Sequence, residues 1–232
     1  MKEVKEVKEV KELLEELKIK PLNIDLFESA FTHISYKNDN SNYPYSDYDR
    51  LEFMGDAVLG FVVARLLFDA HPNKDSGSLT KKRSSLVKGL ALSSKAREMN
   101  FQNYIKMSES VDVPHSIDRI LEDVFEAFIG AYYLNFGDEA VFKFIKKIFG
   151  EDIIKFNEAE LMDYKSRLQI EIQKETTSQI QYVLTSESGT AQDKNFEMSC
   201  VLDGIILGMG SGSSKKKAEQ DAARNALEKR VK

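Results

Sequence analysis

The sequence predicts a multidomain protein, with an all-α domain followed by a small α+β domain whose elements run in the order αβββα. Hydrophobic residues recur at helical spacing along the first two thirds of the chain, and no strand pattern occurs before about residue 178. Three β-type runs follow, separated by turn-forming dipeptides, and an Ala- and Lys-rich segment without helix breakers comes last. At 232 residues, the chain has the length of one large domain or two small ones.

The all-α domain is expected over residues 13–150. The first twelve residues repeat Lys, Glu and Val, which predicts a charged, solvated helical extension over residues 1–12 that lies outside the folded domain. Within the domain, the predicted helices are two short ones on either side of Pro21 and longer ones over 48–70, 78–100, 116–136 and 139–149, the last two ending at Gly137 and Gly150.

A linker over residues 151–160 is expected to lead into the α+β domain, which covers residues 161–232. Its predicted elements are a helix over 161–175, strands over 179–186, 196–202 and 205–210, and a helix over 213–232. Ser188-Gly189 and Asp203-Gly204 are predicted to form the two turns, and Asp-Gly between apolar runs is a strong hairpin signal.

The composition excludes several classes of protein. The 42% of hydrophobic residues, with only 12 Gly and 4 Pro, argue against a disordered or fibrous chain. No apolar run approaches the roughly 18 residues of a membrane span, and the longest, over 57–68, is interrupted by Arg65. The single Cys200 excludes an intramolecular disulfide and a multi-cysteine metal site, and the N-terminus has no apolar signal core. We therefore expect a cytoplasmic protein without membrane association.

The net charge of −5, from 33 Lys and Arg against 38 Asp and Glu, disfavours a purely electrostatic nucleic-acid binder. The charge is unevenly distributed, however. Basic and acidic residues balance over 160–232, so the helical part carries the whole negative charge, while basic residues outnumber acidic ones more than twofold over 213–232. Lys215, Lys216 and Lys217 stand where the last helix begins, and cations beside free helix N–H groups favour phosphate. Taken alone, a solvated Lys-rich helix explains them as well.

Two pairs of acidic residues stand inside apolar helical runs. Glu52 and Asp56 are four residues apart and Asp123 and Glu126 three apart, so each pair lies on one helix face. Buried carboxylates must be paired, neutralised or bound to metal, and four facing carboxylates would suit Mg²⁺ or Mn²⁺. The alternative is that these acids form ion pairs with neighbouring arginines, namely Arg50, Arg65 or Arg119.

Residues 50–59, Arg-Leu-Glu-Phe-Met-Gly-Asp-Ala-Val-Leu, resemble the signature helix of the ribonuclease III family. Residues 32–36, 83–87 and 123–131 resemble further segments of its nuclease domain. The chain from residue 163 onwards is similar to a double-stranded-RNA-binding domain, including Ser-Lys-Lys-Lys-Ala-Glu-Gln-Asp-Ala-Ala over 214–223. The order of the domains is that of the bacterial class with a single nuclease domain.

The resemblance implies an enzyme that hydrolyses double-stranded RNA as a homodimer, using Mg²⁺, for which Mn²⁺ substitutes, and no organic cofactor. It implies 5′-phosphate ends, short 3′ overhangs, and precursor ribosomal and other structured RNAs as substrates. Matching positions make Glu52, Asp56, Asp123 and Glu126 the metal ligands, with Asp56 and Glu126 most directly tied to catalysis. The signature helix lies near the dimer interface in this family, so Phe53 is expected to pack across it.

Two acidic positions depart from the family pattern. Asp49 stands where a Glu is usual, which keeps an auxiliary acid with a shorter side chain. Ser76 stands where another Glu is usual, with Asp75 beside it. These changes put a peripheral metal site or product release in question, whereas the four principal ligands are present.

The resemblance also assigns residues that contact RNA. Ser166 and Gln169 on the first helix of the second domain would face one minor groove, and Gln192 would reach the next. Lys215 and Lys216 would contact phosphates. Gln192 replaces the usual His, and residue 170, often Glu, is Ile, so a weaker grip on RNA is expected.

Two further hypotheses come from other classes of protein. One is a catalytically silent RNA-binding or ribosome-associated scaffold, against which the retained carboxylates argue. The other is a metal-binding helical protein unrelated to RNA, against which the αβββα domain and its lysines argue.

Overall fold

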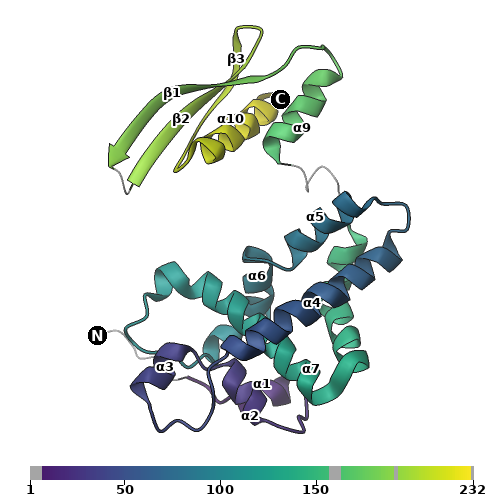
Figure 1. Ribbon diagram of the computed structural model, residues 1–232, viewed down its shortest axis with the longest axis vertical. Helices are drawn as coiled ribbons and strands as arrows, with labels where there is room; N and C mark the ends of the chain where they lie inside the picture. The colour runs from purple at the N-terminus through teal and green to yellow at the C-terminus, as the bar shows by residue number, and fades with distance from the viewer. Residues whose placement is uncertain (1–6, 157–162, 191–192, 231–232) are drawn as a thin grey trace. The chain divides into compact units, whose positions relative to one another are not determined.

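The computed structural model describes residues 7–156, 163–190 and 193–230. It divides the chain into two compact units, Met1–Phe156 and Asn157–Lys232 (Figure 1). The first is helical and the second combines a sheet with helices, so the predicted fold classes are confirmed. Within the described residues, the helices are too short or too polar for any of them to cross a membrane.

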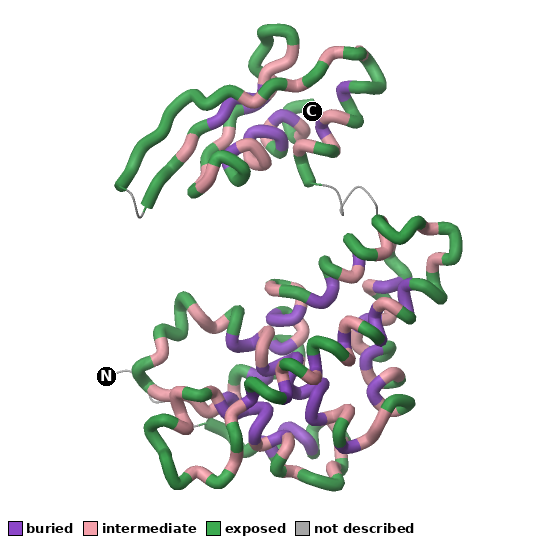
Figure 2. The backbone as a smooth tube through the Cα atoms, in the orientation of Figure 1, coloured by how far each residue is buried: buried purple, intermediate pink, exposed green. Residues whose placement is uncertain are grey.

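The first unit is built around two long helices, α4 and α7, which pack along each other (Figure 1). The elements of this unit are α1 (Val10–Glu16), α2 (Asp25–Ala30), α3 (Ile34–Asp39), α4 (Asp49–Ala70), α5 (Ser76–Leu86), α6 (Leu90–Glu98), the 3-10 helix η1 (Phe101–Asn103) and α7 (Val113–Ile154). Buried aromatic rings meet in the core, where Phe31 contacts Phe101 and Phe128 edge-on, with ring centroids 5.0 and 6.2 Å away. Figure 2 shows this buried centre in purple.

The sequence predicts that residues 1–12 form a solvated extension outside the folded domain, and this prediction is wrong for the second half of the segment. Helix α1 begins at Val10, whose side chain is completely buried in the core together with Leu13 and Leu14. The backbone N–H of Lys8 also donates a hydrogen bond of 3.0 Å to the carbonyl of Asn103. Burial of one repeat valine thus ties this end of the segment to the domain. Residues 1–6 lie outside the described residues.

Glycines break the helical pattern at two places. Gly137 has a φ of 76° and interrupts α7, as the sequence predicts. The single helix predicted over 78–100 is wrong, because Gly89, with a φ of 55°, separates α5 from α6. The N–H of Gly89 instead donates a hydrogen bond of 2.6 Å to the side-chain carboxylate of Glu122 on α7.

Helix α7 also continues beyond Gly150, where the sequence pattern ends it. It runs to Ile154 because Ile153 is buried and Phe149 packs edge-on against Phe125. The linker predicted over residues 151–160 therefore overlaps the last turn of α7, and its residues 157–160 lie outside the described residues.

The second unit is a three-stranded antiparallel sheet packed against helices, and its αβββα order is confirmed. Its elements are α9 (Tyr164–Gln173), β1 (Gln181–Thr190), β2 (Asp193–Leu202), β3 (Ile205–Gly212) and α10 (Lys215–Arg230). The turn predicted at Ser188-Gly189 is wrong, since both residues lie in β1 and pair with Asn195 and Lys194. The turn at Asp203-Gly204 is present, with a positive φ at both residues.

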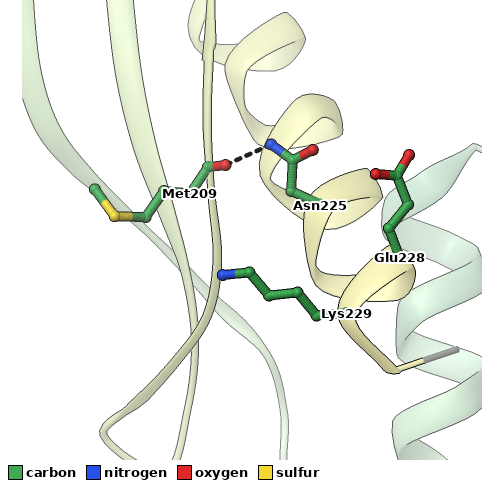
Figure 3. A pocket seen from close by; sticks show the side chains of 4 residues that line it. All are labelled: Met209, Asn225, Glu228 and Lys229. Carbon is green, nitrogen blue, oxygen red and sulfur yellow. Dashed lines mark hydrogen bonds between the residues drawn. The ribbon is translucent and has the colours of Figure 1, made fainter. Parts of the chain in front are cut away.

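Small residues let α10 lie directly on β3. A methyl group on Gly210 would lie 2.1 Å from the backbone nitrogen of Ala222, so only glycine fits. Strand β3 is at one edge of the sheet, and its Met209 carbonyl accepts a hydrogen bond of 2.7 Å from the side-chain amide of Asn225 on α10 (Figure 3). This bond satisfies an edge carbonyl that would otherwise be open to strand pairing.

Candidate active site

The two acidic pairs lie at the crossing of α4 and α7, where two glycines bring the backbones into contact. A methyl group on Gly55 would lie 1.7 Å from the carbonyl oxygen of Glu126, and one on Gly130 would lie 2.3 Å from the carbonyl oxygen of Leu51. Glu52 and Asp56 flank Gly55 in the sequence. The glycine contact therefore fixes the backbones that carry Glu52, Asp56 and Glu126 next to one another.

The carboxylates differ in burial. Glu126 is only 8% exposed, Glu52 and Asp123 are half-buried, and Asp56 is exposed. Burial raises the pKa of Glu126 to about 8, and the negative charges of four acids, Asp56 first, add to this effect. Burial also raises the pKa of Glu52, with Asp123 as the next cause, and that of Asp123 itself. The structure thus brings all four predicted acids into one electrostatic cluster.

The arginine ion pairs of the alternative interpretation do not form in the described part of the chain. Arg65 pairs instead with Asp69, with 2.8 Å between the charged atoms. The charge of Arg119 offsets part of the rise in the pKa values of Glu52 and Asp123, but Arg119 does not come within salt-bridge distance of either. Among the described residues, the acids at the helix crossing therefore lack a directly bonded cation.

Glu122 is a member of this cluster that sequence reasoning missed. Its charge raises the pKa of Glu126, while its carboxylate binds the N–H of Gly89. The only signal in the sequence is its place next to Asp123 in the same apolar run. That signal is weak, because the partner at Gly89 is known only from the tertiary structure.

The donor set fits a hard divalent cation by its chemistry, since carboxylate oxygens are the ligands that Mg²⁺ and Mn²⁺ prefer. Among the described residues, however, no three His, Cys, Asp or Glu side chains converge closely enough in this structure to form a metal cage. The cluster is thus a set of neighbouring acids on a fixed backbone, with its buried member, Glu126, held in an environment that disfavours its negative charge.

The two positions that depart from the family pattern have different environments. Asp49 is the exposed first residue of α4, and its charge contributes to the raised pKa values of Glu52 and Asp123. Ser76 is the first residue of α5, and Asp75 caps that helix by accepting a hydrogen bond of 3.0 Å from the N–H of Ser78. The acid beside Ser76 therefore serves as a helix cap.

Most residues predicted to contact RNA lie in the second unit and are accessible. Ser166 is exposed on α9 and donates a 3.0 Å hydrogen bond to Asp163, while Gln169, one turn later, is half-buried. Lys215 and Lys216 are exposed in the first turn of α10. Gln192 lies outside the described residues.

Phe53, predicted to lie at a dimer interface, is exposed on α4. It is 76% exposed, and Phe61 and Phe68 on the same helix are 71% and 67% exposed. At 100° per residue these three rings lie on one side of the helix. We call them the aromatic face of α4. The last two were missed in the sequence, although their spacing is that of a helical stripe.

The first unit matches the family described as Ribonuclease-III-like over residues 23–153, and residues 164–230 match the double-stranded RNA binding motif. A Ribonuclease 3 of Streptococcus gordonii is 41% identical over 209 residues, which cover 89% of this chain and 90% of the relative. The chain belongs to the ribonuclease III family. A Ribonuclease 3 of Bacillus cereus is 40% identical over 217 residues, or 93% of this chain and 89% of that protein.

Solved structures agree with this assignment. The nuclease domain of ribonuclease III from Campylobacter jejuni is 31% identical to this chain, with a TM-score of 0.52, and the match covers 64% of this chain and 99% of that one. The description of that structure concerns flexibility in a region involved in its dimer formation. With its nuclease domain and its double-stranded RNA binding motif, this member of the family is a double-stranded-RNA endonuclease.

Proposed function

We propose that this ribonuclease III hydrolyses phosphodiester bonds with divalent metal ions held by Glu52, Asp56, Asp123 and Glu126. The observation that carries the proposal is the buried Glu126, whose pKa is raised to about 8 among four other acids. A divalent cation, Mg²⁺ or in its place Mn²⁺, would supply the missing positive charge. When bound, such an ion activates water and stabilises the charge that develops on the phosphate.

The protein's own groups have separate tasks in this proposal. Glu126 and Asp56 lie on opposite helices of the crossing and contribute most directly to catalysis. Glu52 and Asp123 complete the ligand set, and Asp49 at the start of α4 is an auxiliary acid. The Gly55 contact keeps the two helices in register, so that little reorganisation is needed when RNA binds.

Family membership also supports a proposal about the products and substrates. We propose that the enzyme leaves 5′-phosphate ends and short 3′ overhangs, and that it processes precursor ribosomal RNA and other structured RNAs in the cytoplasm. Cleavage of a long perfect RNA duplex, started with Mg²⁺ and stopped with a chelator, tests the proposal. Cut products with 5′-phosphates support it, whereas RNA that is bound and left intact in Mg²⁺ would favour the silent scaffold.

We propose that the protein is a homodimer, in which a second copy of this chain covers the aromatic face of α4. Large exposed apolar faces are unusual on monomers and mark interfaces. Beside Phe61, a cavity of about 280 Å³ is lined by residues that include Ala57, Tyr133 and Phe142. A cavity of this kind suits an aromatic side chain from the second copy. Two active sites in one dimer would let each subunit cut one strand.

Phe53→Glu is expected to weaken the dimer by at least about 30-fold, since loss of an aromatic anchor costs about 2 kcal/mol or more. Sedimentation velocity over a range of concentrations measures the change. Leu22→Glu is the matched control, because Leu22 is 88% exposed and lies outside α4. If the Phe53 and Leu22 variants both sediment like the wild type, α4 is not the interface.

We propose that α9 and α10 hold the duplex, with Ser166 and Gln169 at one minor groove and Gln192 at the next. Lys215 and Lys216 add phosphate contacts at the N-terminus of α10, where backbone N–H groups also favour anions. Because such domains recognise A-form shape, binding should be largely independent of sequence.

Replacing Lys215 and Lys216 together by Ala should weaken duplex binding and reduce the slope of log affinity against log salt by about 2. Fluorescence anisotropy at several salt concentrations measures both quantities. Lys229→Ala, at the other end of α10, is the control and should change neither. An unchanged salt slope in the double variant would remove these lysines from the RNA interface.

A further inference from the structure

Tyr48 is held rigidly at the start of α4. Its side chain is buried, and its backbone N–H donates a hydrogen bond of 3.0 Å to the carbonyl of Thr32. The ring of His33 packs against the Tyr48 ring in a T-shaped arrangement, with 5.7 Å between the ring centroids and 63° between their planes. Backbone and ring contacts together leave the phenol little freedom to turn.

The hydroxyl of Tyr48 reaches across to the acid cluster. It lies 3.3 Å from Oδ2 of Asp123 on α7 and donates a hydrogen bond to it, although the two residues are 75 positions apart in the sequence. Burial and the charge of Asp123 raise the pKa of Tyr48 above its ordinary value, so the phenol keeps its proton. The bond therefore restrains one carboxylate oxygen of Asp123 and leaves the other available.

The position of Tyr48 in the sequence places this contact beside the proposed metal ligands. Tyr48 directly precedes the auxiliary acid Asp49 and stands one helical turn before Glu52. A single side chain thus links the N-terminus of α4 to an acid of α7, in addition to the Gly55 contact. Groups that hydrogen-bond to metal ligands orient those ligands and tune their affinity.

We propose that Tyr48 is a positioning residue, whose hydroxyl orients the Asp123 carboxylate for binding a divalent metal ion. The inference rests on the metal site of the proposed function and adds to it a group that touches neither the metal nor the RNA. It predicts that removal of one oxygen atom from a buried ring, with the packing kept, weakens metal binding.

The test is a titration of the full chain with Mn²⁺ in the absence of RNA. The electron paramagnetic resonance signal of the free ion reports how much Mn²⁺ is bound. Tyr48→Phe is expected to weaken binding by about tenfold, as is typical for loss of an outer hydrogen-bond partner of a ligand. The matched control is Tyr43→Phe, which also loses a hydroxyl next to a carboxylate, that of Glu28 at 3.5 Å, away from the helix crossing. The control should bind Mn²⁺ like the wild type.

A double-variant comparison shows whether Tyr48 acts through Asp123. In an Asp123→Asn background, Tyr48→Phe should cause little further loss of Mn²⁺ affinity, because its effect depends on the carboxylate. If Glu126→Gln weakens Mn²⁺ binding but Tyr48→Phe binds Mn²⁺ as tightly as the wild type, the metal site stands and the inference about Tyr48 is overturned. Absence of Mn²⁺ binding by the wild type would overturn both the inference and the metal site.

Discussion

Glu126→Gln is expected to lower the rate of duplex cleavage by at least about a thousand-fold while leaving the affinity for duplex RNA unchanged. Loss of a metal-stabilised transition state removes several kcal/mol, and about 4 kcal/mol corresponds to a factor of a thousand. The double-stranded RNA binding motif covers residues 164–230 of the second unit, which the substitution does not touch. Single-turnover cleavage in Mg²⁺ and anisotropy in Ca²⁺ or without metal measure the two quantities separately.

The melting temperature measured without metal shows whether the Glu126→Gln variant is folded. The pKa of Glu126 is about 8 in the folded protein against an ordinary value of 4.5, so the folded state holds a proton that the unfolded state releases. Stability from this proton is complete below about pH 4.5 and is lost as the pH rises to about 8. Glutamine stays neutral throughout, so the variant's melting temperature should rise relative to that of the wild type from pH 5 to pH 8. A variant that cuts RNA at the wild-type rate would exclude Glu126 from the catalytic centre.

Gly55→Ala is expected to destabilise the nuclease domain by about 3 kcal/mol, the upper end of ordinary overpacking costs. The added methyl group would lie 1.7 Å from the carbonyl oxygen of Glu126, so α4 and α7 must move apart. For a domain of this size the melting temperature should fall by about 10 °C. The displacement also separates the acids of α4 from those of α7, so cleavage should fall by about a hundredfold even at temperatures where the variant is folded.

Gly60→Ala is the control on the same helix. A methyl group on Gly60 would have nothing within 4 Å, and alanine favours a helix over glycine by about 1 kcal/mol. That variant should melt at or above the wild-type temperature and cleave normally. Similar melting curves for the two variants would show that the glycine contact does not hold the crossing together.

The long helices were predictable because their apolar residues follow the helical period over many turns. Helix α4 and the break of α7 at Gly137 are where the sequence predicts them. The break at Gly89 was not predictable, because a lone glycine is tolerated inside a helix and the carboxylate that binds its N–H comes from Glu122, on another element. Burial of Val10 likewise depends on neighbours supplied by the tertiary fold.

The sequence predicts four of the acids as candidate ligands, but it misses Glu122 and does not predict how the acids are arranged. Spacing shows that Glu52 lies on the same helix face as Asp56, yet it does not show which face of α7 meets them. That information resides in the Gly55 and Gly130 contacts, which become visible only when both helices are in place. The Tyr48 hydroxyl is a similar case, since its bond to Asp123 joins residues far apart in the sequence.

The central claim is that acids of α4 and α7 together hold the catalytic metal. The most direct measurement is anomalous X-ray diffraction from crystals of the protein grown with Mn²⁺. The account predicts a manganese peak between α4 and α7, within about 2.0–2.3 Å of carboxylate oxygens from both helices, Glu126 among them. Ordered carboxylates without a peak at saturating Mn²⁺, or a peak coordinated by residues away from this crossing, would contradict it.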